Sequence, residues 1–291
     1  MEKLFEYVAN ASIKYDLRLL YKIFFIIFKF FLRKKIILKF SECKFFAYPQ
    51  KKELSRWMIR NLKIWEEKMI NIIIKNIKKN DSIFIDIGCN YGAYSIPVSK
   101  TNSNLNVYCF DPSKKSLKRL VENINLNNLK NIKYFELGIG EVRKSVFFDD
   151  DLINYKNSGS YQINNKNIGY KINIDSIDNL IERNEIQPRE NIFIKMDIEG
   201  YEFFALKGLV NTITKYNVMI FFEFSKKIFE NHKFLKKEFI EFININNLKI
   251  YDIDFIELKP EELFLNIENL KKNHDVLGNF ILYKKAINEK A

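Results

Sequence analysis

The sequence predicts an α/β protein built on a Rossmann-like, doubly wound sheet, and three observations support this prediction. Residues 82–99 (SIFIDIGCNYGAYSIPVS) have the pattern of a buried strand, a short glycine loop and the start of a helix. From there to residue 284, strand-like and helix-like segments alternate, which is typical of a sheet covered by helices on both faces. The length of 291 residues allows one large α/β core with one further segment.

The glycine loop directly follows the first predicted strand. Gly88 and Gly92 permit a tight turn and a close approach of the backbone to a ligand, and Asp86 can hold a cationic or hydroxyl-bearing group there. The pattern Gly88-x-Asn90-x-Gly92 after an acid is not the G-x-G-x-x-G fingerprint of dinucleotide-binding domains. It suits a ligand with an amino-acid end better than a pyrophosphate. The alternative is an ordinary glycine-bearing turn between strand and helix.

Charge and composition divide the chain in two. The formal net charge is +12, yet residues 1–80 carry 19 Lys and Arg against 7 Asp and Glu, whereas residues 81–291 carry 29 of each. We therefore predict a basic, helical N-terminal extension at residues 1–80 and a catalytic domain at residues 81–291. Three cysteines without close pairing and only two histidines argue against a disulfide framework, a histidine-built metal site and a His-dependent triad. This composition suits a reducing cytoplasm.

The extension contains an apolar stretch at residues 19–31 that is interrupted by Lys22 and Lys29. It is too short for a membrane-spanning helix and lacks the layout of a secretory signal. Two interpretations remain open: a helix packed on the main domain, or a helix at an anionic membrane surface, which would give peripheral membrane contact through residues 17–40. Residues 53–79 have helical spacing of apolar side chains and predict one helix that docks on the sheet.

The remaining elements follow in order. Strands are predicted at residues 105–110 and 131–137, from residue 192, and at residues 218–224, 248–256 and 275–284, with short antiparallel strands inserted within 142–175. Helices are predicted to start at Pro112–Ser113, to cover 203–210 and to cover 234–246. Asp111, about twenty residues after the glycine loop at the tip of the second strand, can bind both hydroxyls of an adenosine ribose. Ser158 and Ser160 lie at a turn where contact with a ligand or a solvated loop is possible.

Four segments, FIDIGCNYGAYS, CFDPS, IDSID and IKMDIEGYEFFALKG, resemble the FkbM-type methyltransferases, a branch of the class I S-adenosylmethionine-dependent enzymes. The resemblance covers roughly residues 81–284, and K-M-D-I-E-G-Y-E is its specific part. It implies a seven-stranded sheet with its last strand antiparallel, S-adenosylmethionine as cofactor, and O-methylation of a hydroxyl on a sugar, glycan or related small molecule. Such enzymes often act in bacterial surface-glycan or polyketide pathways. Residues before 81 have no clear counterpart in the family pattern.

The resemblance also implies roles for individual residues. Asp86, Gly88, Asn90 and Gly92 match the motif that holds the methionine end of the cofactor, and Asp111 matches the ribose-binding acid. Lys195, Asp197, Glu199 and Glu202 match the motif beside the transferred methyl group, and Asp175 matches a recurrent family position. We hypothesise that Asp197 or Glu199 accepts the proton of the acceptor hydroxyl, with Lys195 or Tyr201 orienting the acceptor.

Alternatives stay open at several points. One interpretation of Glu202 is an acid at a helix N-terminus that interacts with the helix dipole. Two close carboxylates could bind a divalent ion, although we predict no metal site. An NAD-dependent oxidoreductase is disfavoured by the glycine pattern. A nucleic-acid methyltransferase is disfavoured because residues 81–291 carry no net charge and lack an Asn/Asp-Pro-Pro-aromatic motif, so we expect no nucleic-acid partner. A non-catalytic S-adenosylmethionine-binding module anchored at a membrane is a third alternative.

Overall fold

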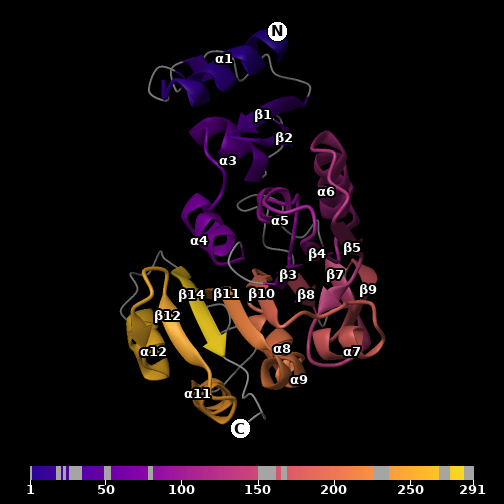
Figure 1. The fold of residues 1–291 in the computed structure, drawn as a ribbon, viewed down its shortest axis with the longest axis vertical. Helices are drawn as coiled ribbons and strands as arrows, with labels where there is room; N and C mark the ends of the chain where they lie inside the picture. Colours follow the sequence, from indigo (N-terminus) through magenta and orange to yellow (C-terminus); the bar gives the residue numbers. More distant parts are fainter. Residues whose placement is uncertain are drawn as a thin grey trace.

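The computed structural model describes residues 2–17, 21, 24–25, 35–48, 54–77, 81–149, 162–164, 169–225, 236–268 and 276–284. Its centre is one mixed sheet (Figure 1). In spatial order the strands are β13 (Glu257–Leu258), β12 (Lys249–Asp252), β14 (Val276–Lys284), β11 (Asn217–Ser225), β10 (Asn191–Met196), β3 (Ser82–Ile87), β4 (Asn106–Phe110) and β5 (Ile132–Phe135).

The direction of the strands confirms the predicted Rossmann-like arrangement. β11, β10, β3, β4 and β5 pair in parallel, while β14 runs antiparallel to both β11 and β12. The sheet has eight strands rather than the seven expected, because the chain turns back after β12 and adds a short strand just beyond the predicted strand at 248–256. Phe255, with a φ of 62°, lies in that turn, and the two-residue β13 then pairs antiparallel with β12.

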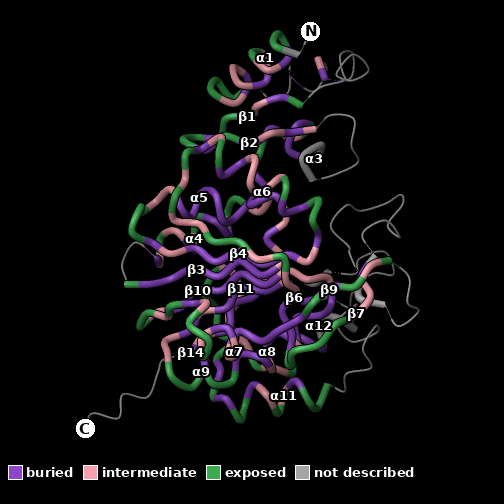
Figure 2. Tube along the Cα trace, turned by 90° about the vertical axis from the view of Figure 1, so that its right-hand side faces the viewer, coloured by how far each residue is buried: buried purple, intermediate pink, exposed green. Residues whose placement is uncertain are grey.

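Two apolar clusters cover the two faces of the sheet. Since side chains alternate along a strand, Phe84 of β3 faces one cluster while Ile83 and Ile85 face the other. The helices on the Phe84 side are α4 (Glu67–Ile77), α5 (Ser95–Lys100) and α6 (Lys114–Leu126). On the opposite side lie α7 (Ile177–Glu182), α8 (Glu202–Lys207), α9 (Val210–Lys215), α11 (Lys236–Ile245) and α12 (Pro260–Glu268) (Figure 1). The strands between these layers are buried across the middle of the molecule (Figure 2). Helices on both faces make the sheet doubly wound.

A second, smaller sheet confirms the inserted strands. It has the order β6 (Gly138–Ile139), β9 (Tyr170–Asp175), β7 (Lys144–Asp149) and β8 (Gln162–Asn164). β7 pairs antiparallel with both β8 and β9, and β6 pairs in parallel with β9. Ser158 and Ser160 lie outside the described residues.

The N-terminal extension is more varied than the helical segment we expected. It contains α1 (Glu2–Lys14), a hairpin of β1 (Ile36–Phe40) and β2 (Cys43–Ala47), and then α3 (Leu54–Asn61) before α4. The single helix predicted at 53–79 is wrong: α3 and α4 are separated by a turn in which Leu62 has a φ of 48° and Glu66 a φ of 52°. Residues with positive φ cannot continue an α-helix. The apolar periodicity of the sequence therefore runs across an interruption of the helix.

Asparagine side chains fasten this hairpin to the main domain. Asn127, which caps the C-terminus of α6, accepts a hydrogen bond from the backbone N–H of Lys44 (2.9 Å) and donates to the Lys44 carbonyl (2.6 Å). Asn123 accepts from the backbone N–H of Phe46 (2.9 Å) and donates to the Tyr91 carbonyl in the glycine loop (2.9 Å). Unpaired groups of an edge strand are thereby satisfied by a helix of the main domain.

The segment for which we considered membrane contact is described only in part. Tyr21 and Phe25 are buried and pack on Phe5 of α1, with ring centroids 5.7 and 6.2 Å apart. Residues 18–20, 22–23 and 26–34, including Lys22 and Lys29, lie outside the described residues. Within the part of the chain that the structure describes, no helix is both long and apolar enough to cross a bilayer.

Candidate active site

The glycine loop lies at the carboxyl edge of the sheet, in contact with the fourth main strand. Its backbone is held by hydrogen bonds from the Gly88 and Cys89 N–H groups to the Phe110 carbonyl (2.9 and 3.2 Å). Gly88, Asn90 and Gly92 all have positive φ, at 81°, 48° and 89°. A Cβ atom at Gly88 would lie 2.0 Å from the carbonyl oxygen of Asp197, so only glycine fits there.

Asp111 joins this loop to the start of α6. The carboxylate is buried at the end of β4 and accepts hydrogen bonds from the backbone N–H groups of Asn90 (2.9 Å) and Ser113 (2.8 Å). Ser113 in turn caps α6 by accepting from the Ser116 N–H (3.3 Å). The predicted ribose-binding acid therefore lies directly beside the predicted glycine loop.

Asp86 is fully buried beneath the loop. It accepts a hydrogen bond from the Ser95 hydroxyl of α5 and pairs in register with Lys195 of the neighbouring strand. Burial raises its pKa to about 6, against the lowering effects of Ser95 and Lys195. The acid at the end of the first strand thus belongs to the polar interior of the site.

Lys195 is a buried cation with an unusual environment. Its side chain is only 1% exposed, and its Nζ lies 3.8 Å from Asp197, 3.9 Å from Glu66 and 5.1 Å from the centre of the Tyr94 ring. Burial alone would lower its pKa, but Asp197, Glu66 and other nearby carboxylates raise it above the ordinary value, so the side chain stays charged. Among the described residues this Nζ has no hydrogen-bond partner. A buried ammonium in that state is suited to donating to a ligand.

Glu66 is a member of the site that sequence reasoning missed. It belongs to the turn between α3 and α4, far from the family motif in sequence, yet its carboxylate accepts hydrogen bonds from the Tyr94 hydroxyl and the Asn279 side chain. Together with the 3.9 Å approach to Lys195, these contacts connect three separate parts of the chain. No local pattern around Glu66 predicts this position, because every partner is distant in sequence.

Asp197 and Glu223 form an acidic pair beside Lys195. Glu223 lies near the end of β11, and its carboxyl group interacts with that of Asp197. Burial, followed by the charge of Asp197, raises the pKa of Glu223 to about 8. Burial also raises the pKa of Asp197, although Lys195 opposes this effect. The negative charge of Asp197 therefore makes it harder for Glu223 to lose its proton.

The other acids of the motif take different positions. Glu199 has a φ of 55° and is partly exposed, and its charge contributes to the raised pKa of Glu223. Glu202 turns inward, and its carboxylate accepts the Ile198 N–H at 3.0 Å. Tyr201, our second candidate for orienting the acceptor, packs against Phe204 and the second sheet instead, with the two ring centroids 4.4 Å apart.

Asp175 has a structural role at the start of α7. It accepts hydrogen bonds from the Ser176 N–H, the Asn179 amide and the Arg183 guanidinium, each at 2.8 Å. Burial would raise the pKa of Asp175, but these bonds together lower it below the ordinary value. Within the described ranges, no group of three or more His, Cys, Asp or Glu side chains has the geometry to hold a metal ion.

Replacing Glu202 by glutamine is expected to change how stability depends on pH. Burial raises the pKa of Glu202 from 4.5 to about 7, so between these values the folded protein retains a proton that the unfolded chain has lost. The free energy of unfolding therefore falls as pH rises through this window, and the full cost is present above pH 7. Glu202→Gln keeps the acceptor for Ile198 and removes the charge. Urea denaturation should show the variant about 3 kcal/mol more stable than the wild type at pH 8 and similar to it at pH 4.5. Equal stability at both values would contradict this account.

The parallel sheet with antiparallel β14, and a glycine loop meeting acids at the carboxyl edge, define a Rossmann-like S-adenosylmethionine-dependent methyltransferase. The chain belongs to the FkbM methyltransferase family, because the family model described as "Methyltransferase FkbM domain" matches residues 86–263. This identification confirms three predictions: the family that the sequence motifs resemble, the enzyme class and the cofactor.

The chain is also similar to individual proteins. The "Hexuronic acid methyltransferase AglP" of Haloferax volcanii is 26% identical over 166 residues, which cover 56% of this chain and 64% of the relative. The "Ribosomal protein L11 methyltransferase" of Thermoanaerobacter sp. is 36% identical over 77 residues, covering 26% of this chain and 25% of that protein. The matches thus span less than two thirds of either relative. The structure of an FkbM methyltransferase from Methylobacillus flagellatus is similar at 18% identity and a TM-score of 0.37, covering 69% of this chain and 43% of that one.

Proposed function

We propose that this protein is an O-methyltransferase that modifies a hydroxyl group of a sugar or glycan. The observation that carries the proposal is the buried Lys195, whose ammonium has no hydrogen-bond partner among the described residues and lies beside the Asp197–Glu223 pair. An ammonium donor next to a proton-accepting carboxylate can bind a hydroxyl oxygen and remove its proton. The name of the Haloferax volcanii relative, a hexuronic acid methyltransferase, points to a sugar as the acceptor.

The residues at the carboxyl edge fit S-adenosylmethionine, which supplies an electrophilic methyl group when bound. The glycine loop leaves no space for a side chain at Gly88, and its three positive φ angles bend the backbone around the edge of the sheet. We assign Asp86, Gly88, Asn90 and Gly92 to the methionine end of the cofactor and Asp111 to its ribose. Carboxylates outnumber the single cation, Lys195, in this cluster. The resulting negative charge favours binding of the positively charged sulfonium.

In this proposal Asp197 is the general base. Its carboxylate lies 3.8 Å from Lys195 and keeps 33% of its side chain exposed, so an acceptor can reach it. Lys195 orients the acceptor oxygen, and the carboxyl of Glu223 beside Asp197 is affected by the charge of that base. Glu199 is the alternative base, because it is partly exposed and affects the same acidic pair.

The charge of this cluster also favours a hydroxyl over a carboxylate as the methylated group. Glu66, Asp86, Asp197 and Glu223 surround one lysine, and the resulting like charges would repel an anionic oxygen. A neutral hydroxyl meets no such repulsion, and it is the group that requires a base.

The test is methyl transfer from radiolabelled S-adenosylmethionine to methyl β-D-glycopyranosides of glucose, galactose and mannose and to the corresponding uronic acids. We expect an alkali-stable methyl ether on at least one sugar. Label recovered only as alkali-labile methyl esters would contradict the choice of a hydroxyl, and absence of transfer to every sugar would contradict a sugar acceptor.

We further propose a bacterial surface polysaccharide as the biological acceptor, modified in the cytoplasm or at the inner face of the membrane. The excess of basic residues in the extension supports contact with an anionic membrane through residues 17–40. Flotation with phosphatidylglycerol vesicles should be weakened in the double variant Lys22→Glu, Lys29→Glu, and unchanged flotation would remove the membrane part of this proposal.

A further inference from the structure

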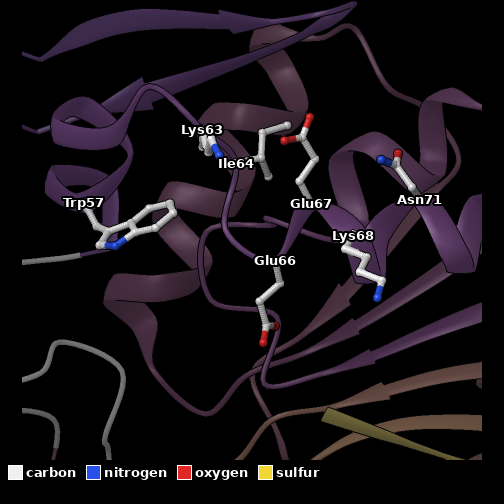
Figure 3. A pocket seen from close by; sticks show the side chains of 7 residues that line it. All are labelled: Trp57, Lys63, Ile64, Glu66, Glu67, Lys68 and Asn71. Carbon is white, nitrogen blue, oxygen red and sulfur yellow. The ribbon is translucent and has the colours of Figure 1, made fainter. Parts of the chain in front are cut away.

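A pocket of about 560 Å³ lies at the turn between α3 and α4, next to the candidate active site. Its walls include the indole of Trp57, the aliphatic Ile64, and the polar side chains of Lys63, Glu66 and Asn71 (Figure 3). The volume falls in the range of small-molecule sites. The extension contributes all of these residues, so nothing in the matched family domain assigns a role to the pocket.

The lining has the chemistry of a sugar site. Trp57 is partly exposed, and Trp65 meets it edge to face with ring centroids 4.9 Å apart, which fixes the indole in place. An indole offers a flat apolar surface for the C–H face of a pyranose. Carboxylate, amide and ammonium groups around it can pair with the ring hydroxyls in both directions.

Glu66 connects this pocket to the catalytic cluster. It lines the pocket, and in Figure 3 its side chain extends toward the strands while that of Glu67 points the opposite way. Its carboxylate also bonds Tyr94 and Asn279 and lies 3.9 Å from the Nζ of Lys195. That Nζ is buried and lacks a hydrogen-bond partner within the described chain, so Glu66 is the residue that relates the pocket lining to the group proposed to orient the acceptor.

The backbone supports this reading. Leu62 and Glu66 both have positive φ, at 48° and 52°, and together they interrupt what would otherwise be a continuous amphipathic helix. Such conformations cost about 1–3 kcal/mol each and persist where the surroundings require them. The break places Glu66 at the boundary between pocket and catalytic cluster.

We infer that this pocket binds a sugar ring of the acceptor, with Trp57 as its stacking surface and Glu66 as a positioning residue that holds Lys195. The inference rests on the proposed sugar O-methylation and adds to it the place where the sugar binds. Residues 54–77 of the extension are therefore part of the active enzyme.

Of the two tryptophans in the chain, Trp57 lines this pocket and Trp65 packs against Trp57, which provides a readout independent of catalysis. In a Trp65→Phe variant all tryptophan fluorescence comes from Trp57. We expect a saturable change in this fluorescence on titration with at least one of the methyl β-D-glycopyranosides named above, in the presence of S-adenosylhomocysteine.

Kinetics of variants then separate binding from folding. Trp57→Ala should raise the KM for the sugar about tenfold, Trp57→Phe should restore most of that loss, and the Kd for S-adenosylhomocysteine should not change in either. Glu66→Gln should raise the KM and lower kcat, since the Nζ of Lys195 loses one of the two carboxylates that form ion pairs with it, at 3.9 and 3.8 Å. Lys75→Ala, exposed on α4 and outside the pocket lining, is the matched control and should behave as the wild type.

The outcomes distinguish this inference from the proposed function. Saturable fluorescence changes without any methyl transfer would support the sugar site and overturn the proposed reaction. Methyl transfer to a sugar with an unchanged KM in Trp57→Ala and Glu66→Gln, and no fluorescence response at concentrations that sustain turnover, would overturn the sugar site and leave the reaction. Failure of both binding and transfer would overturn both.

Discussion

Replacing Asp197 by asparagine is expected to lower kcat for methyl transfer by about 10²–10⁴-fold, the usual contribution of a general base. The amide has nearly the same size and keeps the Gly88 loop in place, because that contact involves the Asp197 backbone. The Kd for S-adenosylhomocysteine should therefore stay within a factor of about two in calorimetric titration, a change of less than ~0.5 kcal/mol.

The pH profile gives a second test of this base. The pKa of Glu223 is raised to about 8 and that of Asp197 is raised as well, so the pair gains its full negative charge only as pH rises through this range. In the wild type, kcat/KM should increase with pH up to about 8 and then level off. In Asp197→Asn this rise should be lost.

Glu199→Gln is the matched comparison for Asp197→Asn. If Glu199→Gln loses turnover while Asp197→Asn keeps it, the base is Glu199. If both variants keep full turnover, neither acid of the motif acts as the base, and the mechanism proposed above is wrong.

Replacing Gly88 by alanine is expected to abolish cofactor binding and to destabilise the fold. The new Cβ would lie 2.0 Å from the backbone oxygen of Asp197, and the φ of 81° disfavours any residue other than glycine. Overpacking against backbone and left-handed strain each cost about 1–3 kcal/mol, so the free energy of unfolding should fall by about 3 kcal/mol or more.

Gly278→Ala is a suitable control, because Gly278 also has a positive φ, at 145°, but a Cβ there meets no heavy atom within 4 Å. It should lose stability through backbone strain alone and should still bind S-adenosylhomocysteine. Urea denaturation and calorimetry on both variants measure the difference. A Gly88→Ala protein that binds S-adenosylhomocysteine as tightly as Gly278→Ala would falsify the close packing between the glycine loop and the Asp197 backbone.

Much of the sheet was predictable because its signals are local. The apolar run of β3, the glycines after it and the acid after β4 each occupy a few consecutive residues. The parallel strands then bring these residues together at one edge whatever the details of the loops. Predictions that needed long-range information were less successful. The helix break at Leu62–Glu66 is hidden by an apolar periodicity that continues across it, and β13 is a two-residue edge strand just beyond the predicted strand at 248–256.

The asparagines of α6 illustrate the same limit. Asn123 and Asn127 stand in an asparagine-rich stretch of a chain with biased composition, where no single asparagine is distinctive. Only the docked hairpin shows that these two side chains bind the backbone of β2. Their partners are about 80 residues away in sequence, and composition does not predict contacts between residues so far apart.

The sequence by itself determined the Rossmann-like class, the glycine loop, and the positions of Asp111, Lys195 and Asp197, because backbone geometry and strand order follow from local pattern. Only the tertiary structure decided which side chains face one another. It turned Glu202 into the interior, packed Tyr201 on the second sheet, and brought Glu66, which accepts a hydrogen bond from Asn279, to within 3.9 Å of Lys195. A buried ammonium requires compensating charge wherever the fold can supply it, and here the fold supplies part of that charge from the N-terminal extension.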